Sequence, residues 1–160
     1  MNTTFKFNGL VIDPDPGSRN RLKQVTTAAT QFKTVFLVDG FREAGFKLKE
    51  MKKVDVIFIS SALEKKEVTD FIAETKQTPG GQDAAYVLVL KGKDQADSNV
   101  ATNVLGGADG LLFEPFSVDG LSEITDLATK VKKERSQTRE KAAMTFLLTD
   151  VVAQVDRIAF

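Results

Sequence analysis

The sequence predicts an α/β fold in which a five-stranded parallel sheet carries helices on both faces. Two observations predict it. Five short apolar runs are spread along the chain, and the segments between them place their apolar residues at helical spacing. Within the runs, apolar residues do not alternate with polar ones, which is typical of strands buried on both faces of a parallel sheet. Strands that alternate with helices then imply right-handed βαβ units.

The predicted strands are each rich in Val, Ile, Leu or Phe. They are Gly9–Asp13, Thr34–Val38, Val54–Ser60, Tyr86–Leu90 and Gly110–Phe113. Five strand–helix repeats within about 130 residues fit the doubly wound strand order 2-1-3-4-5. In this order, functional side chains gather at the carboxyl ends of the strands.

The segments that follow the strands are predicted to be helices, and all but the fourth show an apolar stripe. They are residues 16–31, 39–53, 65–76, 94–107 and 117–131. Either Asp15 or Ser18 can cap the start of the first helix. The fourth ends in a glycine pair, Gly106 and Gly107, which suits the left-handed stop of a helix.

Composition excludes several kinds of site. Lys+Arg and Asp+Glu are both 22, so no overall field favours nucleic acid or an anionic membrane as the main partner of this chain. The absence of cysteine and histidine removes disulfides, thiolate ligands and the commonest general base. No apolar run approaches the roughly 20 residues of a membrane span, and the start lacks the apolar core of a signal peptide. We expect a cytoplasmic protein that is not an enzyme and holds no metal or cofactor.

Three stretches resemble the receiver domain of bacterial response regulators, and together they extend over residues 9 to 131. They are LVIDPDPGSRNRLKQV, VDGFREAGFKLKEMKKVDVIFIS and NVLGGADGLLFEPFS, in the order and spacing of that family. The resemblance implies the flavodoxin-like fold and a place in two-component signalling. It also implies a cis peptide bond before Pro115, at the turn after the fifth strand.

The chain departs from the family at the positions that the resemblance assigns to phosphotransfer. A receiver accepts a phosphoryl group on an aspartate at the end of its third strand, where this chain has Ser60, a hydroxyl without an adjacent base. Asp13 matches the first member of the acidic pair that binds magnesium. Pro14 stands at the second position, and Asp15 lies one place further on. The pocket therefore lacks two of the charged oxygens that a hard cation requires.

Three further positions of the family pattern differ as well. Lys91 aligns with the family's Thr or Ser after strand four, Glu114 with its Lys after strand five, and Leu111 with its switch aromatic. Because strands four and five are neighbours, we expect Lys91 to meet Glu114 across the pocket mouth, and Lys91 could also reach Asp13 in place of a metal. The alternative is that Lys91 and Glu114 point to solvent, where such a pair contributes little.

Residues 131–160 contain neither proline nor glycine and predict a helical extension. Five apolar residues in it repeat at spacings of four, three, four and three, the pattern of a coiled-coil seam. They are Met144, Leu148, Val151, Val155 and Ile158. The seam spans about two heptads, fewer than the roughly three or four that identify a coiled coil. This apolar face is expected to pair with a second copy, fold back on its own domain or enter a partner.

The C-terminal region is also rich in basic residues. The basic run from Lys130 to Lys141 is interpreted as a solvated helix face, with contact to phosphate groups as the alternative. We divide the chain into a pseudo-receiver domain, residues 1–133, and a C-terminal helical extension, residues 134–160.

The sequence therefore predicts a phosphorylation-independent protein–protein interaction module of bacterial two-component-type signalling, a homodimer through its C-terminal helix. Its protein partner is not identified by the residues. Two alternatives stay open: a domain that senses a small ligand or ion in the remodelled pocket, and a flavodoxin-like or hydrolytic activity at the same strand ends.

Overall fold

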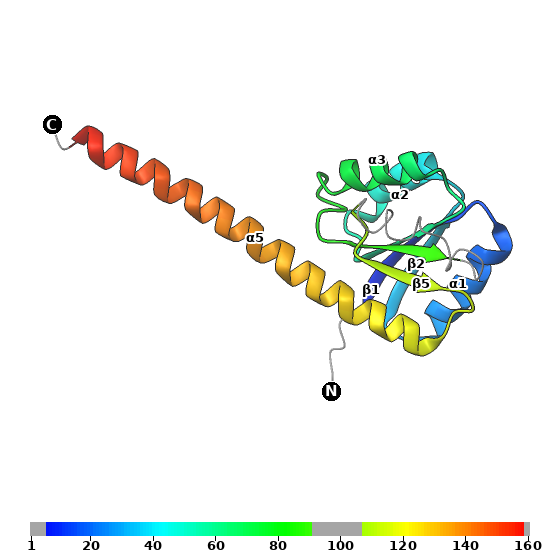
Figure 1. Cartoon of the computed structure of the whole chain (residues 1–160). Coiled ribbons are helices and arrows are strands. Elements are labelled where there is room, and N and C mark those ends of the chain that lie inside the picture. Colours follow the sequence, from blue (N-terminus) through cyan, green and yellow to red (C-terminus); the bar gives the residue numbers. More distant parts are fainter. Residues whose placement is uncertain (1–5, 91–106, 159–160) are drawn as a thin grey trace.

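The structure is a computed structural model that describes residues 6–90 and 107–158, with the backbone alone for residues 149–158. Within these ranges, strands and helices alternate as predicted (Figure 1). The strands are β1 (Phe7–Ile12), β2 (Phe32–Val38), β3 (Val56–Ser60), β4 (Ala85–Leu90) and β5 (Gly110–Phe113). The helices are α1 (Pro16–Ala28), α2 (Phe41–Met51), α3 (Lys65–Thr75) and α5 (Val118–Ile158). The helix predicted between β4 and β5 falls outside the described ranges except for its last residue, Gly107, whose φ of 107° is positive.

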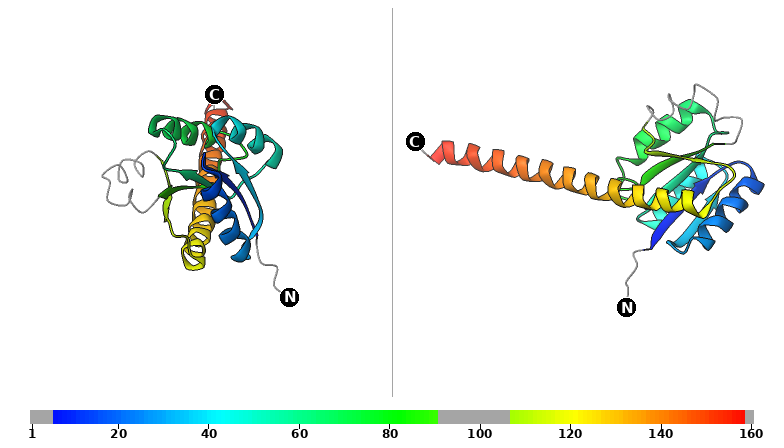
Figure 2. Two further views of the ribbon diagram at one scale, coloured as in Figure 1. Left: turned by 90° about the vertical axis from the view of Figure 1, so that its right-hand side faces the viewer. Right: turned by 60° about the horizontal axis from the view of Figure 1, so that its bottom comes forward.

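The five strands form one parallel sheet in the order β2-β1-β3-β4-β5, which confirms the predicted topology. Helices α1 and α5 cover one face, and α2 and α3 cover the other (Figure 2). Successive strand residues point to opposite faces, so Phe58 packs in the core under α1 and α5 while Ile57 packs in the core under α2 and α3. Both faces are therefore apolar, which is why the strands read as continuous apolar runs.

The last helix is the most unusual element of the fold. Helix α5 has 41 residues, which makes it about 60 Å long. Its first turns pack on the sheet through a buried stripe, and its remainder projects away from the globular part (Figures 1 and 2). The stripe consists of Leu121, Ile124, Ala128 and Val131. Among the described helices, none combines the length and apolar character that crossing a membrane requires.

Candidate functional site

The strand register brings the predicted pocket residues to one edge of the sheet. Strands β1 and β3 stay paired up to their carboxyl ends, which places Asp13 beside Ser60. Strands β4 and β5 are likewise paired up to their ends, which places Glu114 on the same edge. Lys91 lies outside the described residues, and so do its predicted contacts with Glu114 and Asp13.

Asp13 and Ser60 are both 3% exposed, and each accepts a local hydrogen bond. Asp13 Oδ1 accepts from the backbone N–H of Asp15 at 2.9 Å. Ser60 Oγ accepts from the backbone N–H of Ala62 at 3.1 Å. Each oxygen thus supports the turn that follows its strand. The Ser60 hydroxyl has no histidine anywhere in the chain to activate it.

Pro14 and Asp15 form the turn that leads into α1. Pro14 is exposed and offers no side-chain oxygen. The Asp15 carboxylate accepts from the backbone N–H groups of Gly17 and Ser18, both at 3.3 Å. Asp15 is therefore the N-cap of the helix, and the choice between the two predicted caps falls on it rather than on Ser18.

Glu114 has partners that sequence reasoning missed. Its Oε1 accepts from Ser18 Oγ at 3.1 Å and from Arg21 Nη2, also at 3.1 Å. Arg21 is 56% exposed, so this ion pair contributes little to the free energy of unfolding. Ser18 is buried and fixes the carboxylate against the start of α1. A spacing of three residues on one helix face was the only signal for this pair of donors.

Leu111 and Pro115 lie close to the same edge. Leu111 is partly buried and packs against the core under α2 and α3. The Glu114–Pro115 peptide bond is cis, as predicted. Within the described part of the chain, no three His, Cys, Asp or Glu side chains come close enough together to hold a metal ion. The described residues of this edge supply hydrogen bonds, one exposed ion pair and a helix cap.

At the opposite edge of the sheet, three aspartates hold α5. Each aspartate lies at the start of a strand or within two residues of it, and each meets a cation from one side of the helix. The pairs are Lys132–Asp55 at 3.4 Å, Arg135–Asp109 at 2.6 Å and Arg139–Asp83 at 2.5 Å. The interpretation of the basic run as a solvated helix face is therefore wrong for three of its six cations, because these three pair with the domain.

Of the three ion pairs, the one between Arg135 and Asp109 is reinforced by further contacts of both residues. Asp109 Oδ2 also accepts from the backbone N–H of Tyr86 at 2.8 Å, and Arg135 also donates to the carbonyl of Ala84. The Tyr86 ring lies beneath the Arg135 guanidinium, 5.9 Å from its centre. Burial raises the pKa of the Tyr86 phenol and lowers the pKa of the neighbouring Lys76 ammonium. These contacts fix the direction in which α5 leaves the sheet.

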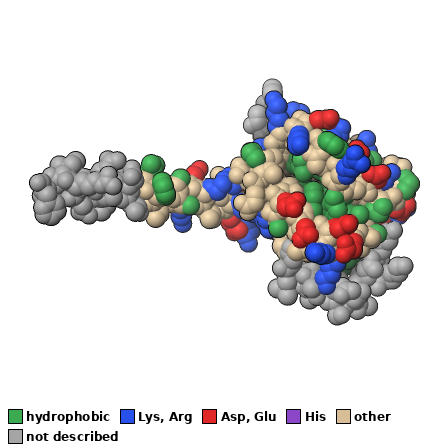
Figure 3. Space-filling view, turned by 90° about the horizontal axis from the view of Figure 1, so that it is seen from above, with side chains coloured by type: hydrophobic (Ala, Val, Ile, Leu, Met, Phe, Trp, Pro, Cys, Tyr) green, Lys and Arg blue, Asp and Glu red, His purple; other side chains and the backbone are tan. Residues whose placement is uncertain are grey.

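Beyond the last ion pair, exposed apolar side chains follow on α5. Met144, Phe146, Leu147 and Leu148 are 59%, 77%, 60% and 59% exposed, respectively. The space-filling view shows apolar side chains on the projecting helix, just before the part that is not described (Figure 3). Met144 and Leu148 belong to the predicted seam. The side chains of its other members, Val151, Val155 and Ile158, are not described.

Comparisons with solved structures find the same fold. A protein of Burkholderia pseudomallei provisionally described as pilus assembly-related has a TM-score of 0.65 at 17% identity, over 82% of this chain and 95% of that one. The receiver domain of a sensor histidine kinase from Pseudomonas aeruginosa, with magnesium in its active-site cleft, has a TM-score of 0.62 at 15% identity, over 79% and 98%. A chemotaxis response regulator of Vibrio cholerae has a TM-score of 0.61 at 16% identity, over 77% and 98%.

No protein-family model and no curated protein matches the chain. The structural likenesses establish a receiver-like fold, as the sequence resemblance implied. At identities of 15–17% they establish the fold alone, so function has to be argued from the residues.

Proposed function

We propose that this chain is a pseudo-receiver: a cytoplasmic protein–protein interaction module of bacterial two-component-type signalling that works without phosphorylation and dimerises through α5. The observation that carries the proposal is the projecting part of α5 with its exposed apolar side chains. Contiguous exposed apolar surface on a soluble protein marks an interaction site. Because most of the stability of helices in proteins comes from packing of an apolar face, pairing with a second copy would stabilise the projecting part of α5.

The carboxyl edge of the sheet supports independence from phosphorylation. Aspartyl phosphorylation requires a carboxylate nucleophile, a metal and groups that hold the product oxygens. Ser60 stands where the nucleophile would be, and its oxygen accepts a hydrogen bond from the following turn. Glu114 presents a carboxylate that accepts hydrogen bonds from Arg21 and Ser18. The negative charge of this carboxylate repels an incoming phosphate. The same features argue against hydrolytic chemistry, because Ser60 has no base.

The three ion pairs between α5 and the strand starts support a role for α5 as a rigid connection. A helix tied to the sheet at Lys132, Arg135 and Arg139 holds the domain at a fixed angle to whatever its distal part binds. Pairing through the distal part would therefore set the mutual orientation of two domains.

The test is the association state of the full chain. Sedimentation velocity at high micromolar concentration is expected to show a dimer for the wild type and a monomer for the double variant Met144→Lys/Leu148→Lys. Ala142→Lys is the matched control, because 100° per residue puts position 142 on the side of the helix away from Met144, and it should stay dimeric. A monomeric wild type would refute dimerisation and favour an α5 that binds another protein.

A receiver-like sensor of a ligand or ion in the remodelled pocket is the alternative. Differential scanning fluorimetry with magnesium at millimolar concentration and with common nucleotides distinguishes it. A rise in unfolding temperature with any of them would favour this sensor, whereas an unchanged temperature is expected.

A further inference from the structure

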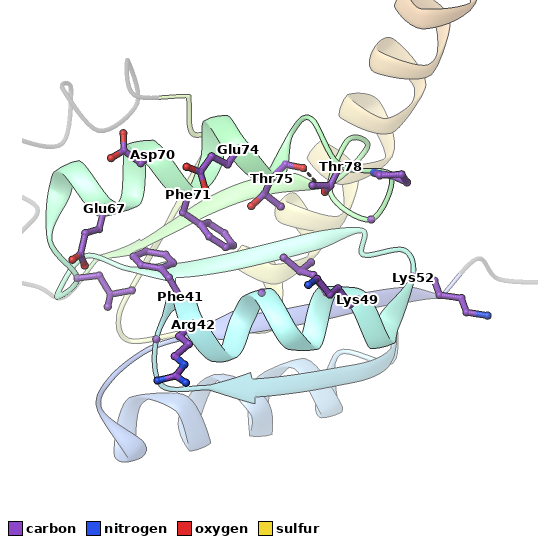
Figure 4. A pocket seen from close by; sticks show the side chains of 16 residues that line it. Phe41, Arg42, Lys49, Lys52, Glu67, Asp70, Phe71, Glu74, Thr75 and Thr78 are labelled. Atoms are coloured by element: carbon purple, nitrogen blue, oxygen red, sulfur yellow. Dashed lines mark hydrogen bonds between the residues drawn. The ribbon is translucent and has the colours of Figure 1, made fainter.

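Helices α2 and α3 lie side by side on one face of the sheet, with a groove of about 900 Å³ between them (Figure 4). Its apolar lining comes from both helices and from the loop before α3. The large apolar side chains are Phe41, Leu48, Leu63 and Phe71, and Pro79 also lines the groove from the loop after α3. The rings of Phe41 and Phe71 stack across the groove with their centroids 4.7 Å apart. A volume of this size is typical of binding sites.

The two walls of the groove carry opposite charges. Helix α2 and the residue after it contribute cations, and α3 contributes anions; all six side chains are exposed. They are Arg42, Lys49 and Lys52 on the α2 wall, and Glu67, Asp70 and Glu74 on the α3 wall. In the space-filling view, apolar side chains gather on the globular part between charged side chains of both signs (Figure 3). In the described part of the chain, none of these six forms an ion pair.

Gly45 lines the groove from the middle of α2. Glycine destabilises a helix interior relative to alanine. A Cβ at this position would meet nothing within 4 Å, and its backbone does not adopt a left-handed conformation. Neither packing inside the domain nor backbone geometry therefore requires glycine here. Its missing side chain leaves open space in the groove instead.

We propose that this groove binds an amphipathic α-helix of a partner protein. The apolar ridge of that helix rests on Phe41 and Leu48, which are partly exposed above the buried Phe71. Its acidic flank faces the α2 wall, and its basic flank faces the α3 wall. An extended peptide would gain few backbone hydrogen bonds from the groove, because the backbone of both walls is already hydrogen-bonded within helices. A helix satisfies its own backbone groups and lays side chains into such a groove. A ligand of one sign would be repelled by one wall.

The site goes beyond the proposed dimerisation, since no residue of α5 lines the groove. The test uses the full chain and three acetylated, amidated helical peptides with the same leucine ridge at i, i+4, i+7 and i+11. One peptide has Glu on one flank and Lys on the other, the second has Glu on both flanks, and the third has Lys on both. Fluorescence anisotropy is expected to give about tenfold tighter binding for the mixed-flank peptide, because several exposed pairs each add a small gain.

Two sets of variants test whether the peptide binds in the groove. Gly45→Leu fills the open space with a strong helix former and should weaken binding of the mixed-flank peptide at least about tenfold, whereas Gly45→Ala should change it less than about threefold. Lys49→Glu leaves one acidic side chain between the two remaining cations of the α2 wall, Arg42 and Lys52, and should weaken binding of the mixed-flank peptide because it repels the acidic flank of that peptide.

The outcomes separate this site from the dimer. The mixed-flank preference should persist in the monomeric Met144→Lys/Leu148→Lys variant. No binding of any peptide by the wild type, equal binding of all three, or unchanged binding by Gly45→Leu would overturn the proposal. Dissociation of the wild-type dimer by Gly45→Leu would also overturn it, since a second copy would then be the occupant.

Discussion

Ser60 is the last residue of β3, and its buried side-chain oxygen accepts a hydrogen bond from the backbone N–H of Ala62. Replacing it with aspartate restores only the nucleophile of a receiver. We expect the Ser60→Asp variant to gain no phosphoryl group, because Pro14 supplies no metal ligand and Glu114 repels phosphate. Intact mass spectrometry after incubation with acetyl phosphate and magnesium measures this directly. A mass increase of one phosphoryl group in the variant would show that the remaining edge residues suffice.

Ser60→Ala is the companion substitution at this position. It leaves the Ala62 N–H without its partner, so the free energy of unfolding should fall by about 1 kcal/mol. The dimer should persist in sedimentation, because the hydroxyl performs no chemistry in the proposed function. Loss of association in a folded Ser60→Ala protein would contradict that function and give the hydroxyl a direct role.

Helix α5 is held on the domain by its three ion pairs with aspartates at the strand starts, which we call the anchor. Arg135→Met removes the cation from the largely buried Asp109 and the donor from the Ala84 carbonyl. The free energy of unfolding should fall by about 1–3 kcal/mol, the usual cost of leaving buried polar groups unpaired. Chemical denaturation monitored by circular dichroism measures this change.

The matched control for the anchor is Lys133→Met, two residues away on the same helix. Lys133 is exposed and has no ion pair among the described residues. Its substitution should change the free energy of unfolding by no more than about 0.5 kcal/mol. Equal effects of Arg135→Met and Lys133→Met would mean that the ion pairs do not hold α5.

For the whole molecule, the contacts of the globular part extend as far as Arg139, past the boundary drawn at residues 133 and 134. A chain ending at Lys141 keeps all three ion pairs and loses the exposed apolar side chains. We expect it to be a monomer whose unfolding temperature matches that of a monomeric full-length variant. A chain ending at Glu134 loses Arg135 and Arg139 and should unfold at a lower temperature. If both truncated chains unfolded at the same temperature, the ion pairs of Arg135 and Arg139 would not stabilise the domain.

The sequence by itself determined the strands, their parallel order and the departures from a phosphoacceptor site. These properties follow from local pattern: continuous apolar runs indicate strands buried on both faces, and Ser60, Pro14 and Glu114 are visible as residue types. The long terminal helix was also predictable, because residues 131–160 lack both helix breakers, proline and glycine.

Only the tertiary structure decided which charges meet. Arg21 and Glu114 are 93 residues apart, and Arg135 and Asp109 are 26 apart. In a chain with equal numbers of acidic and basic residues, every cation has many possible partners, and the pattern of one sequence does not rank them. The groove between α2 and α3 was hidden for the same reason. It exists because two helices separated by β3 pack side by side on one face of the sheet, and only their packing places a cationic wall opposite an anionic one.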